Sequence, residues 1–183
     1  MKFFQMAWQV PGDATIVYQQ NLIDVPFWSG HSISVLMQDA LELSMDADFA
    51  NGQLPTFYDT PGLIARKEFH LALRDLGISN LEVFPAIIRD EANNRVIDDY
   101  VLLNVIGIVS CADLDQSEYE SLGDEDDPMH VIDKLVIKTD RVKGLDIFLV
   151  LEDPQLIVIS ERVHRHLQGY PFKDIYFERL DAA

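Results

Sequence analysis

The chain has 183 residues, of which 48% are hydrophobic and 25% charged, so it is long enough to bury a sizeable core and too apolar to be disordered throughout. It contains 31 acidic and 14 basic residues, a formal net charge of −17, and a surface of that sign repels nucleic acid phosphates and anionic lipid headgroups. The composition therefore argues against direct binding to nucleic acid or a membrane surface, and favours a basic protein as partner.

The first third of the chain contains short extended segments separated by turn residues. From Leu63 the pattern changes, because apolar residues recur every three to four positions, as on one face of a helix. Gly77 follows where a helix C-cap is expected. In chain order, we predict strands over Phe3 to Val10, Ile16 to Tyr18 and Ala40 to Met45, a helix over about Ala65 to Leu76, and a strand from Leu81 that ends in the charged segment Arg89 to Asp99.

The second half is expected to consist mainly of short strands. They are Tyr100 to Val109, Leu135 to Lys138, Leu145 to Leu151, Leu156 to Ile159 and a closing strand around Ile175 to Phe177, with one helix, Glu161 to Gln168, for which Ser160 is a suitable N-cap. Strands outnumber helices and do not alternate regularly with them. We therefore predict an α+β fold with a mixed, mostly antiparallel sheet and a few short helices.

An internal repeat links the two halves. Pro61 to Ile87 and Pro154 to Leu180 share one order of parts: Pro-x-Leu-Ile, a short helix, a glycine and an alternating strand. Matching residues are 93 positions apart at the start of the two segments, and 94 apart from the pair Phe69 and Val163 onward. Ancestral duplication and chance similarity of two strand-helix-strand units explain this equally well. We expect one domain, 1–183, with similar lobes at 1–95 and 96–183.

The single cysteine, Cys111, excludes an intramolecular disulfide and a cysteine-based zinc site, which fits a reducing compartment. Gln5, Gln9 and Pro11 interrupt the N-terminal apolar run before a signal peptide core forms. The longest uncharged apolar stretch, Tyr100 to Ala112, is too short to cross a bilayer. We expect a cytoplasmic protein without a transmembrane helix.

The segment from Asp113 to Asp127 contains eight acidic residues in fifteen and no basic one. A calcium loop would use Asp113, Asp115 and Ser117, with Asp124 at the twelfth position, but Glu118 stands where an EF-hand needs glycine. A solvated loop that serves only solubility is a strong alternative. The third interpretation is a loop that binds a partner, because Tyr119 and Leu122 lie between the acids as apolar anchors. For that interpretation the candidate partner-binding residues are Asp113, Asp115, Glu118, Tyr119, Glu120, Asp124, Glu125, Asp126 and Asp127.

No residue set points to catalysis. The five histidines are dispersed, and His164 and His166 are two apart on a predicted helix, where they face different sides. No nucleophile elbow, phosphate-binding loop or dinucleotide motif occurs, and Cys111 fits a small buried thiol better than a nucleophile. We assign no catalytic residue, cofactor or metal site. A small metal-dependent or hydrolytic enzyme that uses acidic residues near His130 remains the alternative.

Several strings do resemble a known family. They are Tyr100 to Asn104, Cys111 to Asp115, Ser117 to Tyr119, Gly144 to Phe148 and Ile159 to Arg162. Together they resemble the Myxococcus-type immunity domain of bacterial polymorphic toxin systems, most clearly from Leu63 to Leu180. Leu54 to Phe57 is similar to the family's Leu-Pro-Asp-Phe segment, although Thr56 replaces the usual acid, and Arg66 stands where a serine often caps the first helix.

The resemblance implies a non-enzymatic cytoplasmic protein that binds and neutralises a cognate toxin, often one delivered between competing bacteria and often a nuclease. It would do so by covering the active or substrate-binding surface of the toxin. The net charge agrees with this implication, because a toxin that acts on nucleic acid must be basic where it contacts phosphate. The expected partner is therefore a basic toxin protein.

Overall fold

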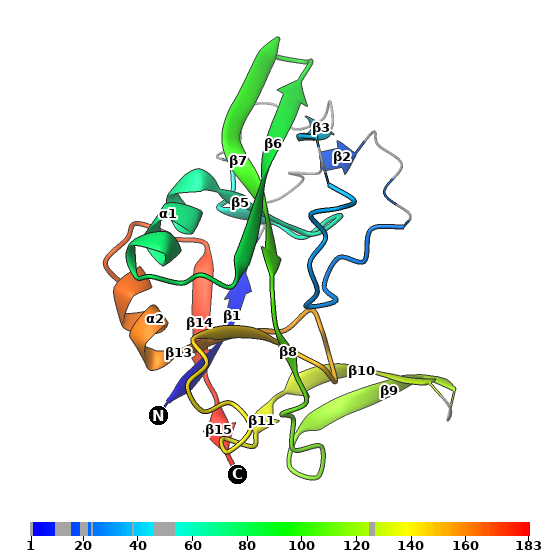
Figure 1. The fold of residues 1–183 in the computed structure, drawn as a ribbon, viewed down its shortest axis with the longest axis vertical. Coiled ribbons are helices and arrows are strands. Elements are labelled where there is room, and N and C mark those ends of the chain that lie inside the picture. Colours follow the sequence, from blue (N-terminus) through cyan, green and yellow to red (C-terminus); the bar gives the residue numbers. More distant parts are fainter. Residues whose placement is uncertain are drawn as a thin grey trace.

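The structure is a computed structural model that describes residues 2–9, 16–18, 22, 24–37, 39–45, 54–124 and 127–183 (Figure 1). Its first half contains β1 (Phe3–Trp8), β2 (Ile16–Tyr18), β3 (Leu41–Met45), β4 (Phe57–Tyr58), β5 (Leu63–Arg66), α1 (Lys67–Asp75), β6 (Leu81–Asp90) and β7 (Arg95–Val105). Its second half contains β8 (Ile108–Val109), β9 (Glu118–Asp124), β10 (Asp127–Lys134), β11 (Val136–Ile137), β12 (Ile147–Val150), β13 (Ile157–Ser160), α2 (Glu161–Leu167), β14 (Ile175–Arg179) and β15 (Asp181–Ala182).

Most strands belong to one of two sheets. One sheet has the order β2-β3-β6-β7-β5-β4 and the other the order β14-β1-β13-β12-β8, while β9 with β10 and β11 with β15 form separate pairs. Among the described strands, only the neighbours β3 and β6, β8 and β12, and β11 and β15 run parallel. The predicted α+β class with a mixed, mostly antiparallel sheet is confirmed.

The predicted elements up to residue 109 are found, with differences at several boundaries. The helix predicted from about Ala65 begins at Lys67, because Ala65 and Arg66 belong to β5, a strand that was not predicted. Val10, at the end of the first predicted strand, lies outside the described residues. The charged segment 89–99 is not a separate region, because it forms the ends of β6 and β7 and the turn between them. The predicted strand 100–109 is interrupted at Ile106 and Gly107, and the positive φ of Gly107, 123°, lets the chain leave the first sheet and enter the second as β8.

The two repeated segments have the same topology. β5 and β6 run parallel on either side of the antiparallel strand β7, and α1 connects them. β13 and β14 run parallel on either side of the antiparallel strand β1, and α2 connects them. The central strand is β7 in one unit and β1 in the other, so the second unit takes its middle strand from the N-terminus. A common origin of the two units and the division into lobes at 1–95 and 96–183 stay predictions.

The spatial register of the repeat corrects the register expected from the sequence. The N-cap residues of the two helices are Arg66 and Ser160, 94 positions apart, and the buried helix residues Phe69 and Val163 keep the same offset. The preceding strands begin at Leu63 and Ile157, again 94 apart. The slip from 93 to 94 is therefore wrong, because burial in the core matches Leu63 to Ile157 rather than to Leu156.

Both predicted helices are present and lie side by side in Figure 1. The Ser160 side chain accepts a hydrogen bond from the backbone N–H of Val163, as an N-cap should, whereas Arg66 makes no side-chain cap of α1. Gly77, at φ 82°, ends α1 in the left-handed conformation that favours glycine. No helix in the described part of the chain is long and apolar enough to cross a lipid bilayer.

Three apolar clusters explain why several strands are hydrophobic on both faces. Along β12, Ile147 and Leu149 point into a central cluster shared by both sheets and both helices, and Phe148 and Val150 point into a second cluster around Cys111. The third cluster covers the other face of the first sheet with residues from segment 22–45. A strand buried on both sides cannot alternate in hydrophobicity, which is why these strands read as continuous apolar runs.

Candidate partner-binding site

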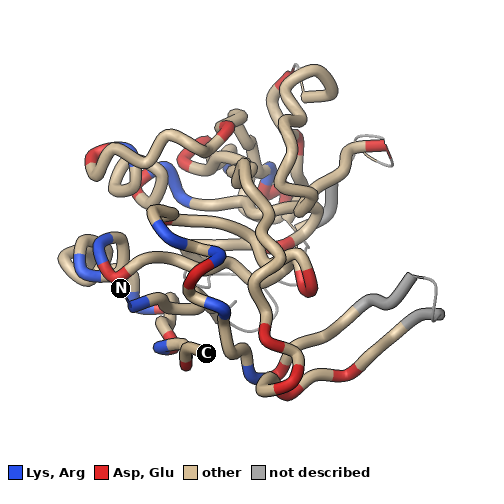
Figure 2. Tube along the Cα trace, turned by 60° about the horizontal axis from the view of Figure 1, so that its bottom comes forward, with Lys and Arg blue, Asp and Glu red and all other residues tan. Residues whose placement is uncertain are grey.

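The acidic segment forms a β-hairpin rather than the loop expected from the sequence. β9 and β10 pair antiparallel from Asp127 opposite Asp124 to Lys134 opposite Glu118. We call this hairpin, residues 118–134, the arm. In Figure 1 it extends away from the two sheets, and in Figure 2 most of the lysine and arginine positions lie toward the helices and the chain ends, away from the free end of the arm. Residues 118–122 of β9 are all exposed, so charged side chains are tolerated on both faces of this strand.

The predicted partner-binding residues do not share one environment. Asp115, Glu118, Tyr119 and Glu120 are exposed, either in the turn before the arm or along β9. Asp124 and Asp127 lie at the strand ends next to the tip, and Glu125 and Asp126 lie outside the described residues.

Asp113 differs from the other candidates because it is buried, with 8% of its surface exposed. Its carboxylate accepts a hydrogen bond from the side-chain amide of Gln116 at 2.9 Å, and its backbone carbonyl accepts from the N–H groups of Gln116 and Ser117. Lys138 lies 3.9 Å from the same carboxylate. These contacts give Asp113 a structural role in the turn that precedes β9.

The register of the arm separates its side chains into two faces. Residues directly opposite each other in an antiparallel pair point to the same side. One face carries Tyr119, Ser121 and His130. The ring centroids of Tyr119 and His130 are 5.0 Å apart with an angle of 73° between the ring planes, and Ser121 Oγ lies 3.3 Å from His130 Nδ1. The other face carries Glu118, Glu120, Leu122 and Val131. The carboxylates of Glu118 and Glu120 therefore share one surface with the aliphatic side chains of Leu122 and Val131.

That surface exposes large apolar side chains. Leu122 is 44% exposed and Val131 45%, and the two are diagonal neighbours across the strands. Tyr119, on the opposite face, is 39% exposed. The sequence predicted Tyr119 and Leu122 as apolar anchors and missed Val131. The sequence signal for Val131 was weak, because Met129, Val131 and Ile132 are all apolar and this segment does not alternate strictly.

The base of the arm is fixed to the body. Ile132 is 6% exposed and packs into the cluster around Cys111. Its backbone N–H donates to the buried carboxylate of Asp153 at 3.0 Å. Ser117 Oγ accepts from the N–H of Val136 at 3.0 Å. A two-stranded hairpin is marginally stable alone, so these contacts are what hold the arm in its position.

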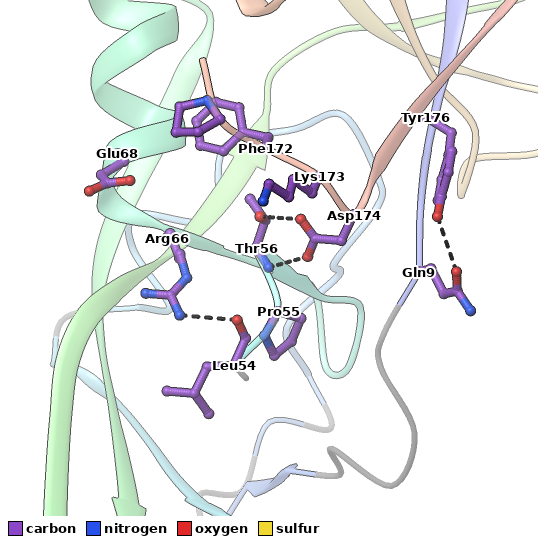
Figure 3. Close-up of a pocket in the computed structure, with 11 residues that line it drawn as sticks. Gln9, Leu54, Pro55, Thr56, Arg66, Glu68, Phe172, Lys173, Asp174 and Tyr176 are labelled. Atoms are coloured by element: carbon purple, nitrogen blue, oxygen red, sulfur yellow. Dashed lines mark hydrogen bonds between the residues drawn. The ribbon is translucent and has the colours of Figure 1, made fainter. Parts of the chain in front are cut away.

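A second candidate site, besides the arm, is a pocket of about 460 Å³ where the first sheet meets the segment before β14 (Figure 3). The Asp174 carboxylate accepts hydrogen bonds from the backbone N–H and the hydroxyl of Thr56, both at 2.5 Å. Arg66 donates to the carbonyl of Leu54 at 3.0 Å and forms an ion pair with Asp99 at 2.6 Å. These polar groups thus join segments that lie far apart in the chain, which is a structural task. The sequence did not predict this arrangement, because its residues are far apart in the chain and form no local motif.

The residues considered for chemistry are placed as follows. Cys111 is fully buried, and burial, with a smaller contribution from Glu152, raises the pKa of its thiol to about 12. His164 stacks on Phe4, whereas His166 contacts the carbonyl of Ala72, so the two rings face different sides as predicted. Within the described residues, no three His, Cys, Asp or Glu side chains are grouped so as to hold a metal ion.

Comparison with known families gives one match. The profile of the immunity protein family (Imm11) matches residues 63–181. This is more than half of the chain. The chain belongs to the Imm11 immunity protein family. No curated protein matches the chain. The resemblance seen in the sequence from Leu63 to Leu180 is confirmed.

The Imm11 region contains the arm, both helices and the first of the two repeated units, but it lacks β1, the middle strand of the second unit. It begins at the first residue of β5. β1, which lies outside the matched region, pairs with β13 through Phe3 to Met6 and with β14 through Phe4 to Trp8. In this Imm11 protein the N-terminal segment therefore completes the sheet of the family region.

Proposed function

We propose that this Imm11 protein binds and neutralises a cognate bacterial toxin by covering its active or substrate-binding surface. The observation that carries the proposal is the family match over a region that presents an exposed, acidic and partly apolar arm. Immunity is a binding function, and the arm offers the two features that a protein interface needs: exposed apolar side chains and charge to orient the partner.

The partner that fits this surface is a basic protein, with a nuclease domain as the leading class. A nuclease is positively charged where it contacts phosphate, and the net charge of −17 gives the present chain the opposite sign. Opposite charge accelerates encounter more than it increases the lifetime of a complex, and salt weakens the effect. We therefore expect fast association at low ionic strength.

Neutralisation by binding requires no catalytic group on the immunity protein and no cofactor. The enzyme alternative centred on His130 would place its chemistry on the exposed face of the arm, where the ring contacts Ser121 and Tyr119. This function requires the chain to bind its partner in the cytoplasm, where an imported or self-produced toxin would act.

Co-expression with the toxin encoded beside its gene tests the proposal. We expect the chain to restore growth of cells that produce the toxin, and to be retained by the tagged toxin at low salt. Absence of both a complex and growth rescue would contradict the proposal. Turnover of a small substrate by the purified chain alone would favour the enzyme alternative.

A four-site variant examines the tip of the arm. Neutralising Asp124, Glu125, Asp126 and Asp127 should slow association with the toxin more than it speeds dissociation. The matched control neutralises four exposed acids elsewhere, Asp24, Glu91, Asp98 and Asp140, and changes the net charge equally. If both variants lose the same on-rate, the total charge matters and the arm does not steer.

A further inference from the structure

The two outer edges of the arm differ in what their backbone groups can bind. In an antiparallel pair, the N–H and C=O groups of a hydrogen-bonded pair of residues point toward each other, and those of the next pair point outward. The N–H of Ile132 donates to Asp153 instead of to β9, so Ile132 and its opposite residue Tyr119 form an outward-pointing pair. By the same alternation, Ser121 opposite His130 and Gly123 opposite Pro128 also point outward.

The β10 edge is largely closed. Asp153 occupies the N–H of Ile132, and Pro128 has no N–H to offer. Only His130 leaves an outward N–H on this edge. Proline and capping side chains of this kind are common ways of blocking an edge strand against further pairing.

The β9 edge is open. Tyr119 and Ser121 each present an outward N–H and C=O, and the described part of the chain supplies no hydrogen-bond partner for these backbone groups. The register gives Gly123 the same outward orientation. In Figure 1, β9 is the strand of the arm on the side away from the sheets. Glu118, Tyr119, Glu120 and Ser121 are all exposed along it. The edge is thus accessible over the length of a short strand.

We propose that the β9 edge takes up an extended, basic segment of the toxin as an added β-strand. This inference rests on the proposed function and specifies its mode of recognition. Main-chain hydrogen bonds to Tyr119, Ser121 and Gly123 supply pairing, and the side chains of one face set specificity. On that face Glu118 and Glu120 receive lysine or arginine side chains of the added strand, and Leu122 receives an apolar one.

The charge of this edge selects the basic occupant over a second copy of the chain. If two β9 edges paired with each other, Glu118 and Glu120 of one copy would lie beside the same acids of the other, and like charges on neighbouring strands destabilise a sheet. A basic strand meets opposite charges at the same positions. The acids therefore discourage self-association through an edge that is otherwise a template for it.

A pair of proline variants tests the edge, with the toxin encoded beside the gene as the probe. Ser121 and His130 are opposite each other, so S121P and H130P each remove an outward N–H without breaking a main-chain hydrogen bond within the arm. Both variants also lose the contact between Ser121 Oγ and His130 Nδ1, so this loss does not distinguish them. S121P blocks the β9 edge and should weaken binding about tenfold or more, while H130P should stay within about twofold of the unchanged chain. S121A controls for the loss of the hydroxyl, and thermal unfolding of all three shows that each is folded.

Hydrogen exchange of the unsubstituted chain gives an answer that does not depend on variants. On complex formation the amides of Tyr119, Ser121 and Gly123 should become protected, and that of His130 should not. Absence of any complex would refute the proposed function itself. A complex that leaves the β9 amides unprotected and tolerates S121P, or one that S121P and H130P weaken equally, would overturn only the edge. Dimerisation of the chain alone that S121P abolishes would assign the edge to self-association instead.

Discussion

Acidic side chains in the body and on the arm have contrasting surroundings. In the body, Asp146 accepts a hydrogen bond from Ser160 Oγ at 2.6 Å and forms an ion pair with Arg162. On the arm, Glu120 is exposed, and the described residues give it no hydrogen bond or ion pair. Glu118 has only an exposed lysine, Lys134, at 4.0 Å. The same residue type thus stabilises the fold in one region and remains available to a partner in the other.

This comparison shows that the net charge alone does not identify a binding surface. Asp153, Asp174 and Glu82 each accept hydrogen bonds from backbone N–H groups, of Ile132, Thr56 and Ile33 respectively. These carboxylates are part of the fold, so the acids that can attract a partner are the exposed ones.

The largest expected difference between the two regions is in stability. D146A removes the acceptor for Ser160 and the carboxylate partner of Arg162, which keeps only its hydrogen bond to the carbonyl of Leu76 among the described contacts. We therefore expect a loss of about 2 kcal/mol in the free energy of unfolding. E120A removes an exposed side chain and should change that free energy by less than about 0.5 kcal/mol. Urea unfolding of both variants measures this. Equal losses of unfolding free energy would show that Glu120 stabilises the fold as much as Asp146 does, which its exposed position does not explain.

The pH dependence of stability sharpens the same contrast. The pKa of Asp146 lies below its usual value of 3.8, and the hydrogen bonds from Arg162 are the largest cause of this shift. A carboxyl with a lowered pKa in the folded state stabilises the protein above the pKa of the unfolded chain, and this stabilisation disappears as the pH falls through the folded-state value. The deficit of D146N relative to the unchanged chain should therefore be full at pH 7 and shrink below about pH 4. A deficit that stays constant down to about pH 2 would contradict the assignment.

Serine offers a third comparison, with a smaller expected effect. Ser160 is fully buried, caps α2 and donates to Asp146, and S160A should cost about 1 kcal/mol of unfolding free energy. Ser121 on the arm is exposed, and S121A should cost less than about 0.5 kcal/mol. Thermal unfolding of the two variants checks the order. The reverse order would mean that the arm, and not α2, depends on its hydroxyl.

The smallest expected effect concerns association. E118Q/E120Q should lower the on-rate for the toxin a few-fold at low salt, and less at high salt, because screening already removes the attraction there. E91Q/D98N changes the charge equally at exposed positions of β6–β7 and should lower the on-rate less. Stopped-flow mixing at two ionic strengths measures both. The same on-rate for the two variants would locate the attraction in the overall charge.

The local elements were predictable from the sequence. Periodicity identified β3 as a half-buried strand and α1 as a helix with Gly77 at its end, and Ser160 was recognised as a cap. The repeat and the family strings were also visible, and the structure and the family match confirm the α+β class and the Imm11 resemblance. Each of these signals lies in residues close together in the chain, or in sequence strings that can be recognised without knowledge of the fold.

The sequence by itself indicated both helices and most strands of the two sheets, because side-chain periodicity reports which face of an element is buried. Only the tertiary structure decided that β1 lies between β13 and β14, that Asp113 turns inward, and that Asp153 and Pro128 close one edge of the arm while the other stays open. Those outcomes depend on pairing and packing between residues distant in the chain, for which local pattern carries no information.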